Sequence, residues 1–372
     1  MTHRLARTAR RSLRAALFVA TLGASACAIV AGIGDQFELA GDAGGPLGPD
    51  GSGEGGGDDA GDGAIPIADG APPSFADALL LAADPAGTIS DMALDDDAVY
   101  WVTQGGKTAA RARRDGAIEP HPLPTLFPYR AIGLDATQVF VSEADIGCAD
   151  AGILAVALKS GSTDVKQTKS CAIRRIVTRD DWTYGLAEVP DAGAVDPDSG
   201  VDQTLTLRRF RAYNIAQSED LMTALLAPRA LAVDGAAVYM ATPNAVIKRT
   251  IATGEVTPLA SGENLPYELA LDGAYVYWVS SASNSVRRVL VDGSGRAETV
   301  AANQQGPDHL TVFAGFVYWS NITDSTLMTA PIGGGAPRRL AADTGHVVRV
   351  AADALGVYWA TADGAVYWMP RR

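Results

Sequence analysis

The sequence of 372 residues predicts an all-β fold, a seven-bladed β-propeller of four-stranded antiparallel blades. Three observations predict it: an aromatic phrase that recurs seven times, a regular spacing of about 40 residues between most copies, and β-forming residues punctuated by Gly and Asp in each unit. Four-stranded sheets repeated at this spacing are typical of propellers.

The aromatic phrase sets the number of blades. Its central residues are Tyr100, Phe140, Tyr184, Tyr239, Tyr277, Tyr318 and Tyr358, spaced by 40, 44, 55, 38, 41 and 40 residues. The long interval contains Glu188–Asp202, which we interpret as an insertion rich in Asp, Pro and Gly. Because adjacent residues of a strand face opposite ways, we expect the Tyr and Trp of each phrase to pack between neighbouring blades rather than to form a sugar-stacking surface.

Each unit has the same order of short segments. An apolar stretch ends in Asp five residues before the aromatic residue in five units, while Arg179 and Phe313 take that place in the third and sixth. A third strand such as Ser285–Val291 then leads through a Gly turn to a fourth strand such as Glu298–Ala302. We therefore predict four strands in each unit.

The two ends of the propeller are expected to meet in one blade. The last unit ends after its third strand, Ala365–Met369, whereas Leu79–Asp84 reads like the fourth strands of other units, for example Leu340–Asp343. We predict that the N-terminal strand closes the last blade, which would remove two exposed sheet edges.

These units resemble the YWTD-type repeat of lipoprotein-receptor propellers, and also exported bacterial proteins with VYW repeats, over residues 79–372. Two features differ from the YWTD pattern: those propellers have six blades, and the Asp of the motif is missing, since the phrases continue as YWVT, YWVS, YWSN and YWAT. The resemblance implies a propeller and transfers no ligand-binding residue.

Residues 1–26 have the features of a secretory signal peptide. Five arginines and no acidic residue precede the apolar run Ala15–Leu22, and small residues lead to Ala26–Cys27. The run is shorter than the roughly 20 residues that a membrane-spanning helix needs. We therefore interpret the segment as a targeting signal.

The stretch Ala24–Cys27 resembles the lipobox of bacterial lipoproteins, with Ala24 where that family usually has Leu. The resemblance implies lipid on Cys27 and a bacterial outer-membrane location, on the periplasmic or cell-surface side, because Ala28 rather than Asp follows the cysteine. The alternative is an ordinary signal-peptidase site, which would release a secreted protein.

Residues 27–78 are expected to form a lipidated cysteine followed by a disordered tether. Residues 28–78 contain ten of the 43 acidic residues, no Lys or Arg, and several Gly-rich runs. Such a segment cannot bury enough apolar surface to offset chain entropy. Most of the net charge of −13 belongs to it, so the propeller, residues 79–372, has no basic footprint for nucleic acid.

We expect the protein to be a monomer.

Cys148 and Cys171 remain as a pair once Cys27 is assigned to lipid. In an exported protein, two remaining cysteines indicate a disulfide. Propeller topology would place both in loops at one face, since the loop between the second and third strands lies on the same side as the entry to the next blade. Two reduced, buried thiols are the alternative.

Charged residues begin the predicted innermost strands, where side chains approach the central channel. The candidate ligand-binding residues at this channel mouth are Asp91, Arg130, Arg174, Arg175, Arg229, Glu268, Asp308, His309 and Arg349. Uniformly apolar residues follow them. Convergent polar groups above a packed body are a candidate binding site, and the arginines could hold a carboxylate or phosphate. Solvated strand ends are the alternative.

The sequence favours a non-enzymatic binding or scaffold module whose partner is a protein, a glycan or a small anionic ligand. One subclass is an assembly scaffold, by fold-level analogy with the propeller lipoprotein of the outer-membrane β-barrel assembly machinery. No common hydrolase or metal motif occurs, and only three His follow the signal. The alternative is a metal-dependent lyase or lactonase-like hydrolase, with Ca²⁺ or Mg²⁺ at Asp91, Glu268, Asp308 and His309, as in some propeller lactonases and seven-bladed streptogramin lyases.

Overall fold

The computed structural model describes residues 76–83, 87–103, 109–113, 118–120, 129–143, 153–159, 166–169, 173–188 and 204–371. All regular elements in these ranges are β-strands. The same ranges contain no helix that is long and apolar enough to cross a membrane. The predicted signal peptide, residues 27–75 of the predicted tether segment, Cys148 and Cys171 lie outside the described residues, whereas residues 76–78 of that segment are described.

Within the described ranges the strands pair into seven four-stranded antiparallel sheets, numbered I to VII here in chain order of their innermost strands. Sheets I and II contain β2 (Ile89–Leu94), β3 (Ala98–Thr103), β4 (Ala109–Arg113) and β5 (Ile118–Pro120), then β6 (Tyr129–Leu134), β7 (Gln138–Glu143), β8 (Ile153–Leu158) and β9 (Lys166–Lys169). Sheets III and IV contain β10 (Ile173–Arg179), β11 (Trp182–Glu188), β12 (Thr204–Arg211) and β13 (Asn214–Leu226), then β14 (Ala230–Val233), β15 (Ala237–Thr242), β16 (Ala245–Thr250) and β17 (Val256–Ser261).

Sheets V and VI follow the same order. They contain β18 (Leu269–Leu271), β19 (Tyr275–Ser280), β20 (Ser285–Leu290) and β21 (Glu298–Ala301), then β22 (Pro307–Phe313), β23 (Phe316–Asn321), β24 (Thr326–Pro331) and β25 (Arg338–Ala341). Sheet VII combines both ends of the body and contains β26 (Val347–Ala352), β27 (Gly356–Thr361), β28 (Ala365–Pro370) and β1 (Leu79–Ala83).

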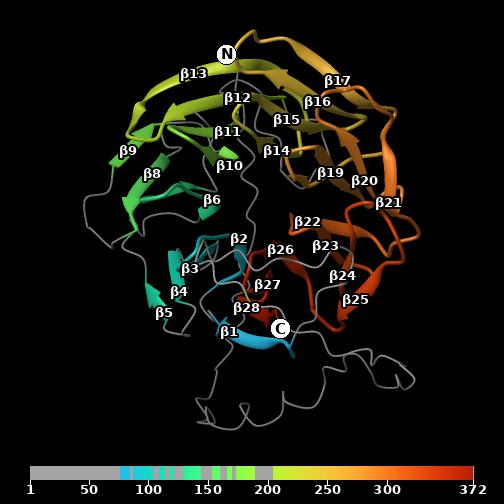
Figure 1. Ribbon diagram of the computed structural model, residues 1–372. Helices are drawn as coiled ribbons and strands as arrows, with labels where there is room; N and C mark the ends of the chain where they lie inside the picture. The colour runs from blue at the N-terminus through green and yellow to red at the C-terminus, as the bar shows by residue number, and fades with distance from the viewer. Residues whose placement is uncertain are drawn as a thin grey trace, which may run out of the picture. The chain divides into compact units, whose positions relative to one another are not determined.

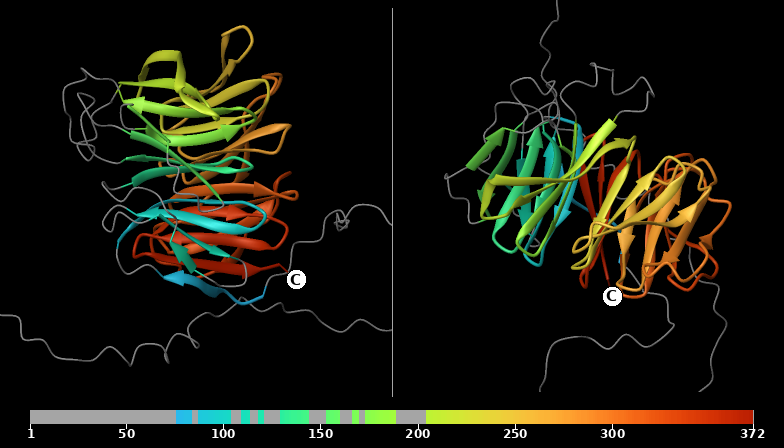
Figure 2. Two further views of the ribbon diagram at one scale, coloured as in Figure 1. Left: turned by 90° about the vertical axis from the view of Figure 1, so that its left-hand side faces the viewer. Right: turned by 90° about the horizontal axis from the view of Figure 1, so that it is seen from above.

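The sheets are arranged around a central axis, with the first strand of each innermost (Figure 1). Each innermost strand contacts those of its two neighbours, and β26 contacts β2, so these contacts form a closed circle. Figure 2 shows the strands running across the thickness of this body. The prediction of an all-β propeller is confirmed.

Strand β1 lies in sheet VII beside the C-terminal strand. Leu79 and Leu80 pair with Trp368 and Tyr367, and after a bulge Ala82 and Ala83 pair with Val366 and Ala365. This is the pairing expected from the sequence. Contacts with the body begin before the strand, since Ala76 N donates to Pro370 O at 2.8 Å and Ala78 packs against the apolar cluster between sheets VI and VII.

The aromatic residues join one sheet to the next. The tyrosine of one phrase packs in the same apolar cluster as the tryptophan of the following sheet, as in Tyr239 with Trp278, Tyr277 with Trp319, and Tyr318 with Trp359. Tyr358 of sheet VII packs with Trp101 of sheet I. All of these side chains are buried, so the expectation of core packing is confirmed.

The recurring Asp shapes the turn between the first and second strands of its sheet. Its Oδ1 accepts hydrogen bonds from the backbone N–H groups two and three residues ahead, at Asp95, Asp135, Asp234, Asp272 and Asp353. This is the Asx-turn chemistry of aspartate. The two sheets without this Asp have shorter turns of two residues. In sheet VI both turn residues, Ala314 and Gly315, have positive φ, as a tight hairpin requires.

Candidate functional site

Bulges near the start of the innermost strands direct charged side chains toward the axis. The register of the first strand against the second shifts in five sheets, between Ile89 and Asp91, Tyr129 and Ala131, Ile173 and Ile176, Pro307 and Leu310, and Val347 and Arg349. A bulge places an extra residue in one strand and re-aims its neighbours. In these five sheets the candidate residues lie at or next to the register shift, whereas Arg229 and Glu268 lie immediately before β14 and β18.

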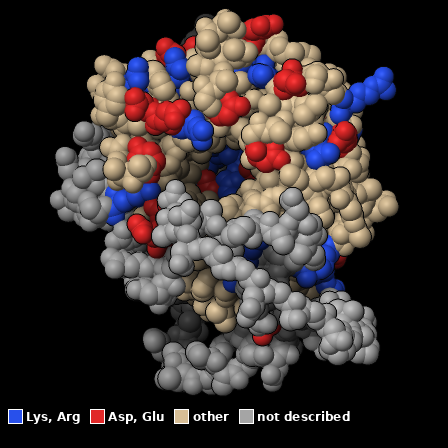
Figure 3. Space-filling model, in the orientation of Figure 1, with Lys and Arg blue, Asp and Glu red and all other residues tan. Residues whose placement is uncertain are grey.

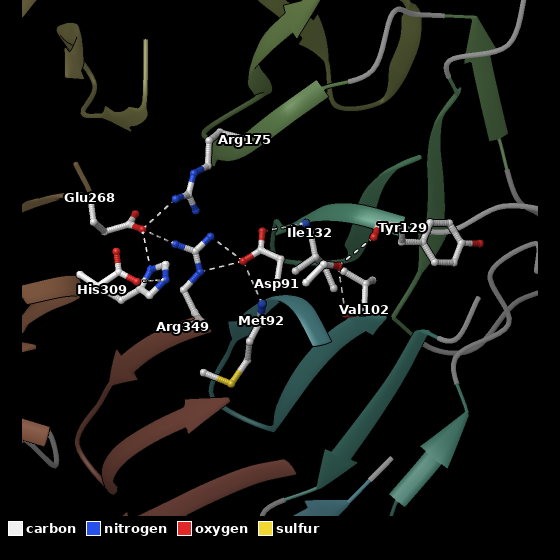
Figure 4. A network of polar contacts seen from close by, with 11 residues as sticks. Asp91, Met92, Val102, Tyr129, Ile132, Arg175, Glu268, His309 and Arg349 are labelled. Carbon is white, nitrogen blue, oxygen red and sulfur yellow. Dashed lines mark hydrogen bonds and ion pairs between the residues drawn. The ribbon is translucent and has the colours of Figure 1, made fainter. Parts of the chain in front are cut away.

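Arg349 of β26 lies at the centre of a polar network on the axis (Figure 4). Its Nε donates to Asp91 Oδ1 at 2.7 Å, and its Nη1 donates to Glu268 Oε2 at 2.7 Å. Asp91 also accepts from the backbone N–H of Met92 at 2.9 Å and from that of Ile132 at 3.1 Å. One guanidinium thus joins carboxylates from sheets I and V, and Asp91 in turn bonds to the backbone of sheet II.

Glu268 receives two further donors. Arg175 Nη2 lies 3.0 Å from Glu268 Oε2, and His309 Nδ1 lies 3.2 Å from the same oxygen. Burial alone would raise the pKa of Glu268, but the charges of Arg175 and Arg349, followed by the contact with His309, hold the pKa well below its usual value of 4.5. Glu268 is therefore a carboxylate at neutral pH.

His309 lies between two carboxylates. Its Nδ1 faces Glu268 and its Nε2 lies 3.2 Å from Asp308 Oδ2. Burial lowers the pKa of His309, but the hydrogen bonds with Asp308 and Glu268 outweigh burial and raise that pKa above 6.5. The axial network, defined as Asp91, Arg175, Glu268, Asp308, His309 and Arg349, is charge-balanced when His309 is protonated. Ala131 and Ala230 occupy the equivalent axial positions of sheets II and IV.

A second cluster lies beside this network and carries excess positive charge. Arg130 Nη1 and Arg174 Nε both donate to the same oxygen of Glu188, each at 3.1 Å. Burial and then the charge of Arg174 lower the pKa of Arg130. Arg229, on the next sheet, is exposed. We call Arg130, Arg174, Arg229 and Glu188 the basic rim; it spans sheets II to IV. Figure 3 shows a central hollow in which basic and acidic atoms are visible.

Below the axial network lies a cavity of about 400 Å³. Four network residues, Asp91, Arg175, Glu268 and Arg349, line it. The rest of its lining comes from five innermost strands, and the side chains there are apolar except for Thr178. One residue beyond the axial positions these strands present Met92, Ile132, Ile176, Leu231 and Leu269. The predicted order of charge above hydrocarbon is therefore present.

The structure joins eight of the nine candidate residues in two clusters. Six form the axial network, Arg130 and Arg174 meet at Glu188, and Arg229 makes no ion pair within the described residues. Glu188 was missed as a site residue because it reads as the first residue of an acidic insertion. Glu188 is the last residue of β11, the strand that carries the aromatic phrase of sheet III. Its place at the end of that strand was the sequence feature that could have indicated a site residue.

The carboxylates do not form an open metal site. Asp91 and Glu268 are occupied by arginines, and no group of three or more His, Cys, Asp or Glu residues in the described ranges is arranged to hold a metal ion. A cation at this place would have to displace Arg349. The geometry therefore does not fit the Ca²⁺ or Mg²⁺ alternative.

The fold is similar to several known propellers. No protein-family model and no curated protein matches the chain. Virginiamycin B lyase from Staphylococcus aureus is similar with a TM-score of 0.62 at 12% identity, over 80% of this chain and 99% of that one. The WD40 propeller domain of Doa1 has a TM-score of 0.60 at 10% identity, over 81% and 98% of the two chains, and the WD40 repeats of RRP9 have 0.61 at 11%, over 81% and 99%. At these identities the similarity concerns the fold alone.

Proposed function

We propose that the protein is a non-enzymatic binding or scaffold module whose propeller recognises an anionic group at its channel mouth. The observation that carries this proposal is the basic rim, in which two guanidiniums share one oxygen of Glu188 while Arg229 is exposed. A phosphate or carboxylate would relieve the repulsion between Arg130 and Arg174 and would use their forked N–H donors.

The axial network supports a binding role over metal-dependent chemistry. Both ring nitrogens of His309 already face carboxylates, Nδ1 towards Glu268 and Nε2 towards Asp308, and the arginines neutralise the two buried carboxylates Asp91 and Glu268. The competing lyase or lactonase function would require the network to open. Virginiamycin B lyase shares only the fold with this chain, at 12% identity, and its lyase activity supplies no reacting residue here.

The proposal also includes the export and display of this module. We propose that residues 1–26 are removed, that Cys27 carries lipid, and that the acidic tether displays the propeller from a bacterial outer membrane. We further propose that sheets I to VII are the complete set of seven blades, closed by β1. The YWTD-type resemblance remains part of this proposal because its support is the repeat pattern alone.

Titration of the full chain with inorganic phosphate and with citrate tests the proposed function. We expect saturable binding by calorimetry and at least a tenfold loss of affinity in the double variant Arg130→Gln/Arg174→Gln. Arg296→Gln is the matched control, because it removes an exposed arginine from a turn on the outer part of sheet V. Equal affinities in the two variants would contradict the proposal. Metal-dependent turnover in a lactone panel would instead favour the enzymatic alternative.

A further inference from the structure

The cavity below the axial network is a candidate ligand site that is separate from the basic rim. Its volume of about 400 Å³ falls within the range of small-ligand pockets, roughly 300–1,000 Å³. Such pockets combine a mainly apolar lining with a few placed polar groups. Here the four charged side chains gather at one end, whereas most other lining residues are apolar, so an occupant would have its polar head at the network and most of its hydrocarbon against the strands.

Arg175 supplies the donors at the polar end. Its Nη2 is bonded to Glu268, while none of its other N–H groups has a hydrogen-bond partner among the described residues. The side chain is only 15% exposed and lies within 6.0 Å of the Tyr267 ring, which limits its movement. The guanidinium can therefore donate to an acceptor at the top of the cavity while it keeps its bond to Glu268.

Charge selects the kind of acceptor. The four charged residues that line the cavity are two arginines and two carboxylates, and they are paired with one another. A ligand cation would meet Arg175 and Arg349, and a ligand anion would meet Asp91 and Glu268. A neutral carbonyl oxygen can accept a hydrogen bond from Arg175 without repulsion from the arginines or from the carboxylates.

We propose that this cavity binds a small uncharged amphiphile, with a carbonyl or amide oxygen accepting from Arg175 and a hydrocarbon body against Met92, Ile176, Leu231 and Leu269. The site is distinct from the basic rim, since no rim residue lines the cavity. The inference goes beyond the proposed recognition of an anion, and it holds or fails separately.

Three probes of equal chain length test the head group: octanamide, octanoate and octylammonium, each titrated calorimetrically into the full chain. We expect octanamide to bind saturably and at least fivefold more tightly than either charged probe. Tighter binding of octanoate or octylammonium, or no saturable binding of octanamide, would overturn the proposal.

Two alanines at the same strand position provide a matched pair of variants. Ala93 pairs with Tyr100 and lines the cavity, whereas Ala270 pairs with Tyr277 and does not line it; both are half-buried. We expect Ala93→Phe to weaken octanamide binding at least tenfold and Ala270→Phe to leave it within twofold. Equal weakening by both would contradict the proposal.

Arg175→Lys is a second test that does not depend on whether Ala93→Phe folds. Lysine keeps a positive charge near Glu268 but loses the forked donors of the guanidinium. We expect a loss of at least fivefold in octanamide affinity, while phosphate binding at the rim stays within twofold of the native chain. Unchanged octanamide affinity in this variant would overturn the assignment of Arg175. The double variant Arg130→Gln/Arg174→Gln should bind octanamide normally.

Discussion

Removing β1 tests whether the N-terminal strand closes the propeller. The perturbation is a deletion of residues 28–84 from the full chain, and its control is a deletion of residues 28–75, which ends before the first described contact, the bond from Ala76 N to Pro370 O. The larger deletion removes four backbone pairings and leaves β28 as an unpaired edge.

The expected loss follows from what β1 buries. Ala82 is 3% exposed and Leu81 packs against the cluster of Trp101 and Tyr358, while Leu79 and Leu80 are 51% and 54% exposed. Full burial of a leucine contributes about 1.5–3 kcal/mol, so one largely buried and two half-buried leucines with Ala82 contribute about 3–5 kcal/mol. This loss is comparable with the whole free energy of unfolding of a typical protein, roughly 5–15 kcal/mol.

Thermal unfolding followed by circular dichroism measures the difference between the two deletions. We expect the larger deletion to lower the melting temperature by about 10 °C relative to the smaller one, or to yield no soluble monomer. The smaller deletion should unfold like the full chain. Melting temperatures that agree within about 2 °C would refute closure by β1.

Four further predictions address the network and the proposed export. Arg349→Met should destabilise the fold by about 3–5 kcal/mol in urea unfolding, because it leaves two buried carboxylates without their shared partner, whereas Arg130→Gln at the more exposed rim should cost at most about 1 kcal/mol. Because the pKa of His309 is raised in the fold, protonated His309 contributes fully to the free energy of unfolding below pH 6.5, and this contribution is lost as the pH rises through the raised pKa. Urea unfolding should therefore show a lower free energy of unfolding at pH 9 than at pH 6. His309→Gln should remove this part of the pH dependence. Cys27→Ser should abolish acyl labelling and move the protein to the soluble fraction, and a native N-terminus without lipid mass would contradict the anchor. Peptide mapping under non-reducing conditions should find Cys148 linked to Cys171, and two free thiols would exclude the bridge.

The repeat could be read from the sequence because its determinants are local. The Asp turns involve residues two and three positions apart. The Tyr and Trp of one phrase are adjacent in the chain, and each packs against a different neighbouring sheet. Even the exceptions follow local rules, since Ala314–Gly315 forms a shorter turn where the Asp is missing. The extra contact of Ala76 was missed because one backbone bond has no side-chain signature.

The site was less predictable because its contacts cross the ring. Position in the repeat indicated which residues approach the axis, but Arg349 joins Asp91 and Glu268, which are 258 and 81 residues away. Those pairings depend on side-chain length and on the small Ala131 and Ala230 at two of the seven positions. The structure pairs Arg175 and Arg349 with acids of other sheets, and position in the repeat does not indicate these partners.

Stability alone does not require ions on the axis. Placing charged groups in a buried site carries a desolvation cost that well-packed hydrocarbon avoids, and replacing buried ion pairs by apolar residues is often neutral or stabilising. Apolar side chains already surround the axis one residue further along the strands, at Met92, Ile132 and Leu269. The axial network divides a basic rim from an apolar cavity, and this separation gives one channel two chemically different surfaces. Ligand binding would account for both the basic rim and the cavity, whereas core packing accounts only for the apolar side chains of the cavity.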